Sequence, residues 1–591
     1  MSLDLGTLPY FTPLVKDYLT NFERTPIREF FPLAPDAPHE QFRTVIDARL
    51  LREKSLPAEH RSTVIAAIRS QHEKLGTLCN ATERQLEKLA SPDTVAVVTG
   101  QQAGMLGGPL YTFYKAFTAV RFAQSLERQF PEFSFVPIFW VETEDHDLEE
   151  IASVTVLAAD SQVKRITYVP TERGMNPEAP WRKQAGRLLL EAGPLETFFE
   201  ELRASLSPTE WSAPSLDLFR QCYTPDRTMG EAFTALLLTY FAEDGLLAID
   251  GNTRELKVLE KDLFRREIER TPELSEAIVL QSVKLEESYH AQVKPRSINL
   301  FYIDDAGERL AIVEREKGAS TEGMREFFLK GSRARFTEPE LLATLEAHPE
   351  RFSPNVVMRP LYQDSLLPTV AYIAGPGEMA YFAQFRPSYA WANLPMPLIR
   401  PRLTATIIEE RFERIFTKFR ITAEDVLTEA HGHNIALFDA MIDSTLGPRF
   451  EQSLAEIDRA LESLRTNVSS ADPSLDGALT NLKGKILTSV RDFESKTIAA
   501  ERKRHATTKA QLDKLLAAVL PSGELQEREI NLVYFLNKYG PGFYTMLKTL
   551  LMPVLAEPRE HHIIHLLQPA PLSENIARTS EGAERLSAPA N

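Results

Sequence analysis

Two polar segments of the chain each follow an apolar run typical of a buried strand, and both carry side chains suited to binding and catalysis. Residues 99–115 contain four glycines, two glutamines and a lysine, and residues 142–147 contain four acids and a histidine. Glycine turns before a helix let an anion approach backbone N–H groups. Carboxylates beside a histidine can bind an ammonium group or move a proton near neutral pH. The segments therefore predict an anion or nucleotide site and a catalytic or substrate-binding group.

One strand–helix–strand unit is predicted to position both segments. Residues 95–98 and 136–141 are β-rich and apolar, and residues 109–126 between them have the pattern of a helix. Parallel strands joined by a helix place their carboxyl ends at the same edge of a sheet, where ligands bind in the crevice. We therefore expect an α/β protein with a Rossmann-like parallel sheet and both polar segments at one crevice.

The glycine-rich segment supplies the candidate nucleotide-binding residues. Its spacing matches neither the Walker pattern nor the dinucleotide pattern GxGxxG. The alternative is a tight turn that needs glycine for packing, with the lysine on a solvated helix face. On the binding interpretation, the cofactor-binding residues are Thr99, Gly100, Gln101, Gln102, Gly104, Gly107, Gly108 and Lys115.

The acidic segment supplies the candidate catalytic residues Asp145, His146 and Asp147. They would bind a substrate ammonium or accept its proton. A divalent-metal site is a rival interpretation, and a solvated acidic turn is the structural alternative. Because neighbouring residues of an extended chain point in opposite directions, few of these side chains can converge on one ion, and no metal site is predicted.

A third group of candidates follows from residues 353–387, where glycine and proline are dense. This density favours a site-forming loop with an irregular backbone. The alternative is loop scaffolding with surface arginines. With three residues from the first two segments and their strand, the predicted substrate-binding set is Tyr111, Trp140, Glu144, Arg359, Gln363, Asp364, Gly375, Gly377, Glu378 and Arg402.

Composition restricts the class of protein. The chain has 591 residues and a formal net charge of −16, which disfavours non-specific nucleic-acid binding. No run approaches the roughly 18 apolar residues of a membrane helix. Only two cysteines are present, and they form no disulfide framework. We expect a cytoplasmic protein with no membrane or nucleic-acid partner.

Four regions are predicted along the chain. A mainly helical segment covers residues 1–90, and the Rossmann-like core covers 91–404, with insertions at about 160–230 and 255–350; the first of these is expected to cover the crevice. Residues 405–520 form a helical arm, and 521–591 return to the core and end in a polar tail from about residue 572. The arm is predicted as an antiparallel coiled-coil hairpin because apolar residues alternate spacings of four and three, at 450, 454, 457, 461, 464 and 468 and again at 475, 479, 482, 486, 490 and 493.

These segments resemble the bacterial cysteine-adding enzymes of bacillithiol biosynthesis. No single short motif carries the resemblance, which extends in order over nearly the whole chain. The matching stretches are residues 98–104, 108–112, 139–140, 144–147, 353–355, 359–361, 363–364, 367–372, 375–378 and 525–528.

The resemblance implies a core shared with class I aminoacyl-tRNA synthetases and pantothenate synthetase, and a coiled-coil arm that forms a homodimer. It also implies the joining of cysteine to the amino group of glucosaminyl malate. The chain has no HIGH-type or KMSKS-type motif, and residues 107–111 occupy the place of the first.

The predicted mechanism uses ATP with Mg²⁺ to activate the cysteine carboxylate. The glycine-rich loop and Lys115 would hold phosphates, and Arg359 and Arg402 would hold the malate carboxylates. Two alternatives remain: another nucleotide-dependent transferase or ligase on the same core, and a non-catalytic coiled-coil protein that binds a metabolite.

Overall fold

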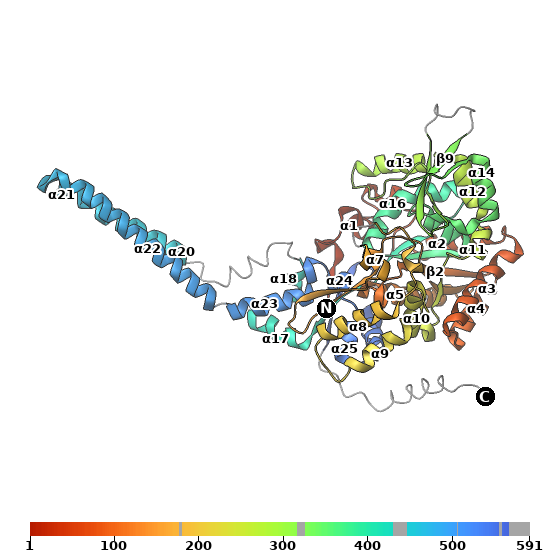
Figure 1. The fold of residues 1–591 in the computed structure, drawn as a ribbon, viewed down its shortest axis with the longest axis horizontal. Coiled ribbons are helices and arrows are strands. Elements are labelled where there is room, and N and C mark those ends of the chain that lie inside the picture. The colour runs from red at the N-terminus through yellow and green to blue at the C-terminus, as the bar shows by residue number, and fades with distance from the viewer. Residues whose placement is uncertain (177–179, 316–324, 429–445, 505, 555–557, 567–591) are drawn as a thin grey trace. The chain divides into compact units, whose positions relative to one another are not determined.

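The computed structural model describes residues 1–176, 180–315, 325–428, 446–504, 506–554 and 558–566 (Figure 1). Contacts within the chain divide it into two units, Met1–Ile408 with Glu524–Asn591, and Glu409–Gly523. The polar tail predicted from about residue 572 lies outside the described residues.

A five-stranded parallel sheet forms the centre of the larger unit, in the order β13-β12-β2-β3-β6. Its strands are β2 (Thr94–Gln102), β3 (Ser134–Glu142), β6 (Leu247–Ile249), β12 (Thr369–Ala374) and β13 (Leu398–Pro401). Helix α5 (Leu110–Gln129) connects β2 to β3, which pair in register along their whole length. The predicted Rossmann-like fold and its strand–helix–strand unit are therefore confirmed.

The middle strand β2 is apolar because both faces of the sheet are covered. Its residues Val95–Val98 are fully buried, and helices α2 (His39–Glu53), α4 (Asn80–Ala90) and α5 contact it. A central parallel strand has no solvated face, so its sequence is a continuous apolar run rather than an alternating one. The polar residues of the unit therefore gather where the strands end.

Several other elements agree with the sequence pattern. Strands β7 (Leu300–Ile303) and β8 (Arg309–Glu314) form an antiparallel hairpin, and α10 (Met229–Phe241) is an apolar, largely buried helix. The apolar run after the acidic segment forms β4 (Ser153–Leu157), which pairs antiparallel with β5 (Val163–Thr167) in a separate two-stranded sheet. The insertion after β5 contains helices α7 (Thr171–Met175), α8 (Ala192–Ser205) and α9 (Ser212–Cys222).

The prediction of an irregular loop at residues 353–387 is wrong, because most of this segment is helical. It forms α15 (Met358–Leu366) and α16 (Pro376–Trp391) on either side of β12. Proline fits the first turn of a helix, where its missing N–H would have no intrahelical partner. Pro376 occupies that position in α16, and the Glu378 carboxylate caps the same turn by accepting the Gly375 N–H at 2.6 Å. The glycine and proline pattern therefore marks a helix start.

Two smaller sheets complete the larger unit. The antiparallel sheet β10-β9-β8-β7-β11 adds β9 (Glu326–Leu329), β10 (Arg335–Thr337) and β11 (Phe352–Pro354). The sheet β1-β15-β14 joins the chain's early and late segments through β1 (Ser2–Asp4), β14 (Thr404–Glu409) and β15 (Glu560–Leu566). The remaining helices of eight or more residues in this unit are α1 (Pro13–Thr20), α3 (Ala58–Leu75), α12 (Lys261–Arg270), α13 (Glu273–Glu286), α14 (Glu338–Ala347) and α26 (Phe543–Leu551).

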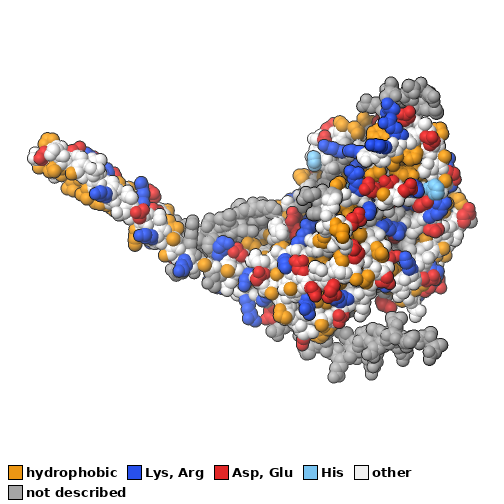
Figure 2. Space-filling view, in the orientation of Figure 1, with side chains coloured by type: hydrophobic (Ala, Val, Ile, Leu, Met, Phe, Trp, Pro, Cys, Tyr) orange, Lys and Arg blue, Asp and Glu red, His pale blue; other side chains and the backbone are white. Residues whose placement is uncertain are grey.

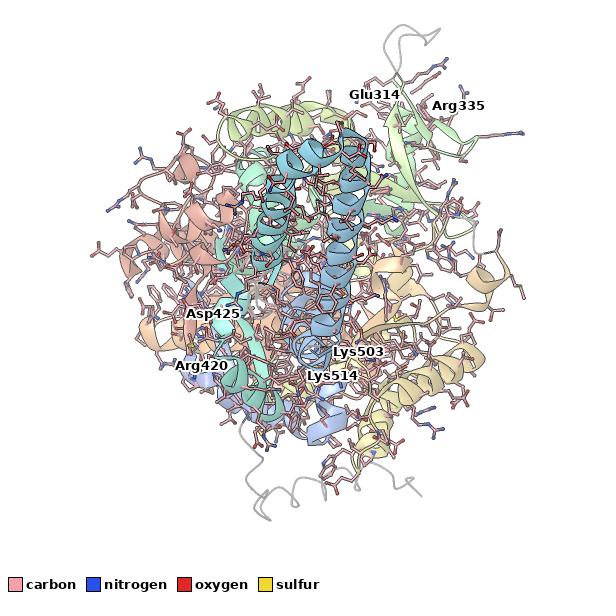
Figure 3. The ribbon with its side chains drawn as sticks, turned by 90° about the vertical axis from the view of Figure 1, so that its left-hand side faces the viewer. Glu314, Arg335, Arg420, Asp425, Lys503 and Lys514 are labelled. Atoms are coloured by element: carbon pink, nitrogen blue, oxygen red, sulfur yellow. The ribbon has the colours of Figure 1, made fainter. Side chains whose placement is uncertain are left out.

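The smaller unit contains the predicted coiled-coil hairpin. Its long helices, α20 (Leu446–Ser463) and α22 (Asp476–Arg504), pack together and are linked by α21 (Arg465–Ala471) and a short 3₁₀ turn, η7 (Pro473–Leu475). Phe450 contacts Phe493 near one end and Lys483 pairs with Glu462 at 2.9 Å nearer the other, so the helices run antiparallel. Figure 3 shows them side by side. Helices α17 (Glu410–Phe419), α18 (Ala423–Thr428) and α23 (Ala506–Val519) are the other α-helices in the described part of this unit.

Candidate active site

A cavity of about 430 Å³ lies at the carboxyl ends of the central strands. Gly100 and Gln102 from β2, Glu142 from β3 and Tyr372 from β12 contribute to its wall. The chain proceeds from β2 to β3 and β6 on one side of the sheet, then returns to β12 and β13 on the other. The cavity therefore lies at the point where strand order reverses, which is where open α/β sheets bind their ligands.

Twelve of the predicted site residues line this cavity. They come from all three candidate groups, so the chain brings together segments more than 250 residues apart. The twelve are Gly100, Gln101, Gln102, Tyr111, Lys115, Trp140, Asp145, Arg359, Gly375, Gly377, Glu378 and Arg402. Their individual roles stay predictions.

The other predicted residues lie elsewhere. Gly104 and Gly108 line an adjoining cavity of about 280 Å³, which shares Gln101, Gln102, Tyr111, Glu150 and Arg528 with the first. Thr99 is buried in the sheet and donates to the carbonyl oxygen of Ile373 at 2.9 Å. The remaining six are outside the wall of the main cavity: Gly107, Glu144, His146, Asp147, Gln363 and Asp364.

Among these six, Gln363, Asp364 and Asp147 have partners with a structural role. Gln363 and Asp364 are buried side by side, and Asp364 also accepts from the Tyr389 hydroxyl at 2.6 Å. Exposed Asp147 caps the short helix α6 (Leu148–Ile151) by accepting the N–H of Glu150 at 3.1 Å. These contacts stabilise the fold near the cavity.

The glycine-rich loop has the geometry of a packed turn. Gly107 and Gly108 have φ values of +84° and +69°, which side chains other than glycine rarely adopt. The loop's N–H groups bond inside the protein: Ala103 donates to Glu142, Gly107 to Gly104 and the Tyr223 hydroxyl, Gly108 to Met105, and Leu110 to Ile530. The arrangement favours the packing alternative for the loop, because these N–H groups already have acceptors.

Lys115 is fully engaged in the cavity wall. Its ammonium donates to the carbonyl oxygen of Gly100 at 2.8 Å and to Gln101 Oε1 at 3.0 Å, and pairs with Glu378 at 2.5 Å. Burial lowers the Lys115 pKa, and Glu378 opposes that shift. Glu378 also accepts from the Tyr372 hydroxyl at 2.7 Å. Lys115 thus links β2 to the start of α16, and its charge is offset by a carboxylate.

Asp145 and His146 are positioned by an arginine from the distant hairpin. Arg309, the first residue of β8, is buried and places Nη1 3.2 Å from Asp145 Oδ1 and 3.1 Å from His146 Nδ1. Burial raises the pKa of Asp145, but the hydrogen bond to His146 and the Arg309 charge outweigh it and bring the pKa to about 2. Asp145 is therefore ionised at neutral pH.

Glu142 is a cavity residue absent from the predicted set. It ends β3, accepts the backbone N–H of Glu144 at 3.0 Å and lies 3.4 Å from the Trp140 indole nitrogen. Burial, followed by repulsion from Glu144, raises the pKa of Glu142 to about 7, although Arg359 opposes the shift. The sequence contains one signal for this residue, because Glu142 is the first acid of the segment 142–147.

Arg359, on α15, lines the main cavity, and its direct contacts are with uncharged side chains. It donates to Gln363 Oε1 at 3.0 Å, contributes a hydrogen bond to Tyr381, and lies 5.8 Å from the centre of the Tyr372 ring. Sequence reasoning also missed Arg309, Asn355, Tyr372, Tyr381 and Arg528, which line the cavity. Nothing in the local sequence around Arg309 indicates that it reaches the end of β3.

Arg402 forms a buried ion pair with Glu527 at 2.7 Å. The Glu527 carboxylate also accepts the N–H of Ala405 at 2.8 Å. The pair connects the end of the Rossmann-like region to α24 (Gln526–Glu529), the matching stretch near the chain's end. Arg402, which was predicted to hold a malate carboxylate, is therefore already paired with a carboxylate of the protein itself.

The described residues contain no group of three or more His, Cys, Asp or Glu side chains placed to hold a metal ion. Within the same ranges, no helix has the length and apolar character needed to cross a membrane. Acidic and basic side chains are interspersed on the face of the larger unit seen in Figure 2.

A parallel sheet with a polar cavity at its switch point defines a Rossmann-like α/β protein of the type that binds small molecules at this edge. The chain belongs to the bacillithiol biosynthesis BshC family. Residues 1–403 match its N-terminal Rossmann-like domain, and residues 405–566 match its C-terminal coiled-coil domain. The resemblance identified from the sequence is therefore confirmed.

Curated relatives support the same family over most of the chain. A protein of Chlorobaculum tepidum is 36% identical over 82% of this chain and 85% of its own length. A protein of Salinibacter ruber is 35% identical over 91% of this chain and 93% of its own length. A protein of Bacillus velezensis is 30% identical over 84% of this chain and 89% of its own length. Each of the three carries the name "Putative cysteine ligase BshC".

Proposed function

We propose that this chain is a ligase that joins the carboxyl group of cysteine to the amino group of glucosaminyl malate, the last step of bacillithiol synthesis. The observation that supports this most is the polar cavity at the switch point of a BshC Rossmann-like domain, lined by residues from all three predicted groups. The names of the curated relatives support cysteine as the substrate to be ligated.

Forming an amide from a free carboxylate requires an activated acyl group. Transfer of an adenylyl group from ATP to the cysteine carboxylate, with release of pyrophosphate, would supply that activation. The glucosamine nitrogen then attacks the carbonyl carbon, AMP leaves, and the nitrogen loses a proton. His146 is the proposed proton acceptor, because Asp145 and Arg309 orient its ring beside the cavity and its side chain is 38% exposed.

The cavity wall determines how ATP would be held. The backbone N–H groups of the glycine-rich loop have internal acceptors. The Gln101 and Gln102 side chains, which line both adjoining cavities, are the proposed phosphate contacts, each through the N–H groups of an amide that already donates to Tyr111 or Asp145. Mg²⁺ commonly retains water and binds substrate phosphates with only one or two carboxylates. We therefore expect it to enter with ATP.

Removing His146 should separate the two halves of the reaction. The His146→Ala variant is expected to retain cysteine-dependent exchange of pyrophosphate into ATP, because activation requires no proton acceptor for the amine. Amide formation should fall by about 10²- to 10⁴-fold, the usual contribution of a general base. Isotope exchange and mass spectrometry of the product measure the two steps separately.

The same pair of assays tests the assignment as a whole. Exchange that another amino acid supports better than cysteine would favour a different nucleotide-dependent ligase on this core. Absence of exchange in the parent protein would contradict ATP activation by this route, and a normal amide-forming rate in His146→Ala would contradict the role of the histidine.

The coiled-coil hairpin is the proposed homodimerisation element. Its exposed apolar side chains include Leu482 and Phe493, which are 50% and 64% exposed although Phe493 also contacts Phe450 across the hairpin. Leucine and phenylalanine side chains that stay exposed on a two-helix hairpin are typical of a surface that packs against another pair of helices.

A further inference from the structure

The cations of the main cavity differ in whether they have a carboxylate partner. Four of them form ion pairs: Lys115 with Glu378, Arg309 with Asp145, Arg402 with Glu527 and Arg528 with Glu524. Arg359 is the exception among the cavity cations in the described part of the chain, since its contacts are Gln363, Tyr381 and the Tyr372 ring. A half-buried guanidinium whose direct contacts are all neutral remains available to an anion.

Of the four carboxylates of the cavity, Glu142 and Glu150 form no ion pair among the described residues, and Glu142 is the less exposed of the two. Glu378 and Asp145 are paired, and Glu150 is solvent-exposed and hydrogen-bonded to Gln102. Glu142 accepts only the Glu144 N–H and a long contact from Trp140, and forms no ion pair among the described residues. An ionised carboxylate in this position lacks a cationic partner.

Arg359 and Glu142 face the same cavity without touching each other. Their charges act on one another, since Arg359 lowers the Glu142 pKa and Glu142 raises that of Arg359, yet they form no ion pair. Direct pairing would remove both charges from use by a ligand. A gap between opposite, uncompensated charges instead fits a molecule that carries both an anion and a cation.

We propose that Arg359 and Glu142 form the α-amino acid subsite of the cavity, with Arg359 binding the carboxylate and Glu142 the ammonium group. This inference rests on the proposed ligase function and assigns Arg359 to the amino acid rather than to malate. Trp140 and Tyr372 line the same wall and offer aromatic surface to a small thiol side chain. The raised pKa of Glu142 fits a carboxyl group that gains its counter-ion only from a ligand.

Two truncated analogues of cysteine test the assignment charge by charge. Cysteamine lacks the carboxylate, and 3-mercaptopropionate lacks the ammonium group. Calorimetric titration of the full chain under reducing conditions should show cysteine binding about 10- to 100-fold more tightly than either analogue. Arg359→Gln should weaken cysteine by a similar factor and leave cysteamine unchanged, whereas Glu142→Gln should weaken cysteine and leave 3-mercaptopropionate unchanged.

Matched surface variants control for loss of charge. Arg220 and Glu196 form an ion pair at 2.7 Å that does not line the cavity, so Arg220→Gln and Glu196→Gln should bind cysteine like the parent. Arg359→Lys retains a positive charge without the bidentate geometry and should lose less affinity than Arg359→Gln. Circular dichroism of each variant establishes that it is folded.

The outcomes distinguish this inference from the function on which it rests. Equal cysteine affinity in the parent, Arg359→Gln and Glu142→Gln proteins would overturn the subsite while leaving the ligase proposal intact. Equal weakening of cysteine and cysteamine by Arg359→Gln would also overturn it. Tighter binding of serine or alanine than cysteine, with the predicted dependence on both residues, would support the subsite and contradict cysteine as the substrate.

Discussion

Replacing Lys257 by methionine is expected to lower the free energy of unfolding by about 3–5 kcal/mol. Lys257, on α11 (Arg254–Leu259), has a fully buried side chain and forms an ion pair with Glu144, whose side chain is 6% exposed. The ammonium also lies 4.7 Å from the centre of the Tyr362 ring. Methionine keeps the apolar stem but leaves the Glu144 carboxylate buried without its counter-charge.

Chemical denaturation measures the effect, and two further variants identify its cause. The double variant Lys257→Met with Glu144→Gln should recover much of the loss, because no uncompensated charge remains. Lys74→Met removes an exposed ion pair with Glu231 and should cost at most about 1 kcal/mol. A Lys257→Met protein within 1 kcal/mol of the parent would show that Glu144 is not held as a buried carboxylate.

Glu142→Gln is expected to stabilise the protein at pH 8 by about 3 kcal/mol and to have little effect at pH 4. The Glu142 pKa is about 7 in the folded protein against 4.5 ordinarily, so the folded state binds more protons between these values. Stability from this carboxyl is therefore lost as pH rises through that range, at about 1.36 kcal/mol per pKa unit. Glutamine stays neutral and avoids the loss.

The free energy of unfolding of Glu142→Gln and of the parent should be measured as a function of pH. The difference between the two curves gives the contribution of this carboxyl group alone, because the other titrating groups are common to both proteins. Burial has the largest effect on the Glu142 pKa, and the charges of Glu144, Arg359 and Arg309 also act on it. In the parent, cysteine affinity should increase from pH 6 to pH 8 as Glu142 ionises, and Glu142→Gln should lose that increase. A constant difference in stability at all pH values would contradict the raised pKa.

The central fold could be predicted because its signals are local. The run Val95–Val98 is apolar because β2 is covered on both faces, and the helix after it has a continuous helical pattern. The hairpin helices likewise follow from a regular heptad spacing. The segment around Pro376 was misread because proline and glycine mark both irregular loops and helix starts, and local composition does not separate the two.

The site could be predicted only in part, because its finer arrangement depends on long-range contacts. Arg309 reaches Asp145 from a hairpin more than 160 residues later, and Glu527 offsets Arg402 from near the chain's end. Glu142 and Glu144 are two residues apart, which in a continuing strand would place them on one face. Because β3 ends at Glu142, Glu144 instead turns toward Lys257, and only the first of the two acids lines the cavity.

The most direct test of cysteine ligation at this cavity is the low-molecular-weight thiol pool of cells that lack the gene, measured by mass spectrometry. We expect bacillithiol to disappear and glucosaminyl malate to accumulate. The parent and Arg220→Gln proteins should reverse both changes, and Arg359→Gln should not. An unchanged bacillithiol pool without the gene, or full restoration by Arg359→Gln, would contradict cysteine ligation at this cavity.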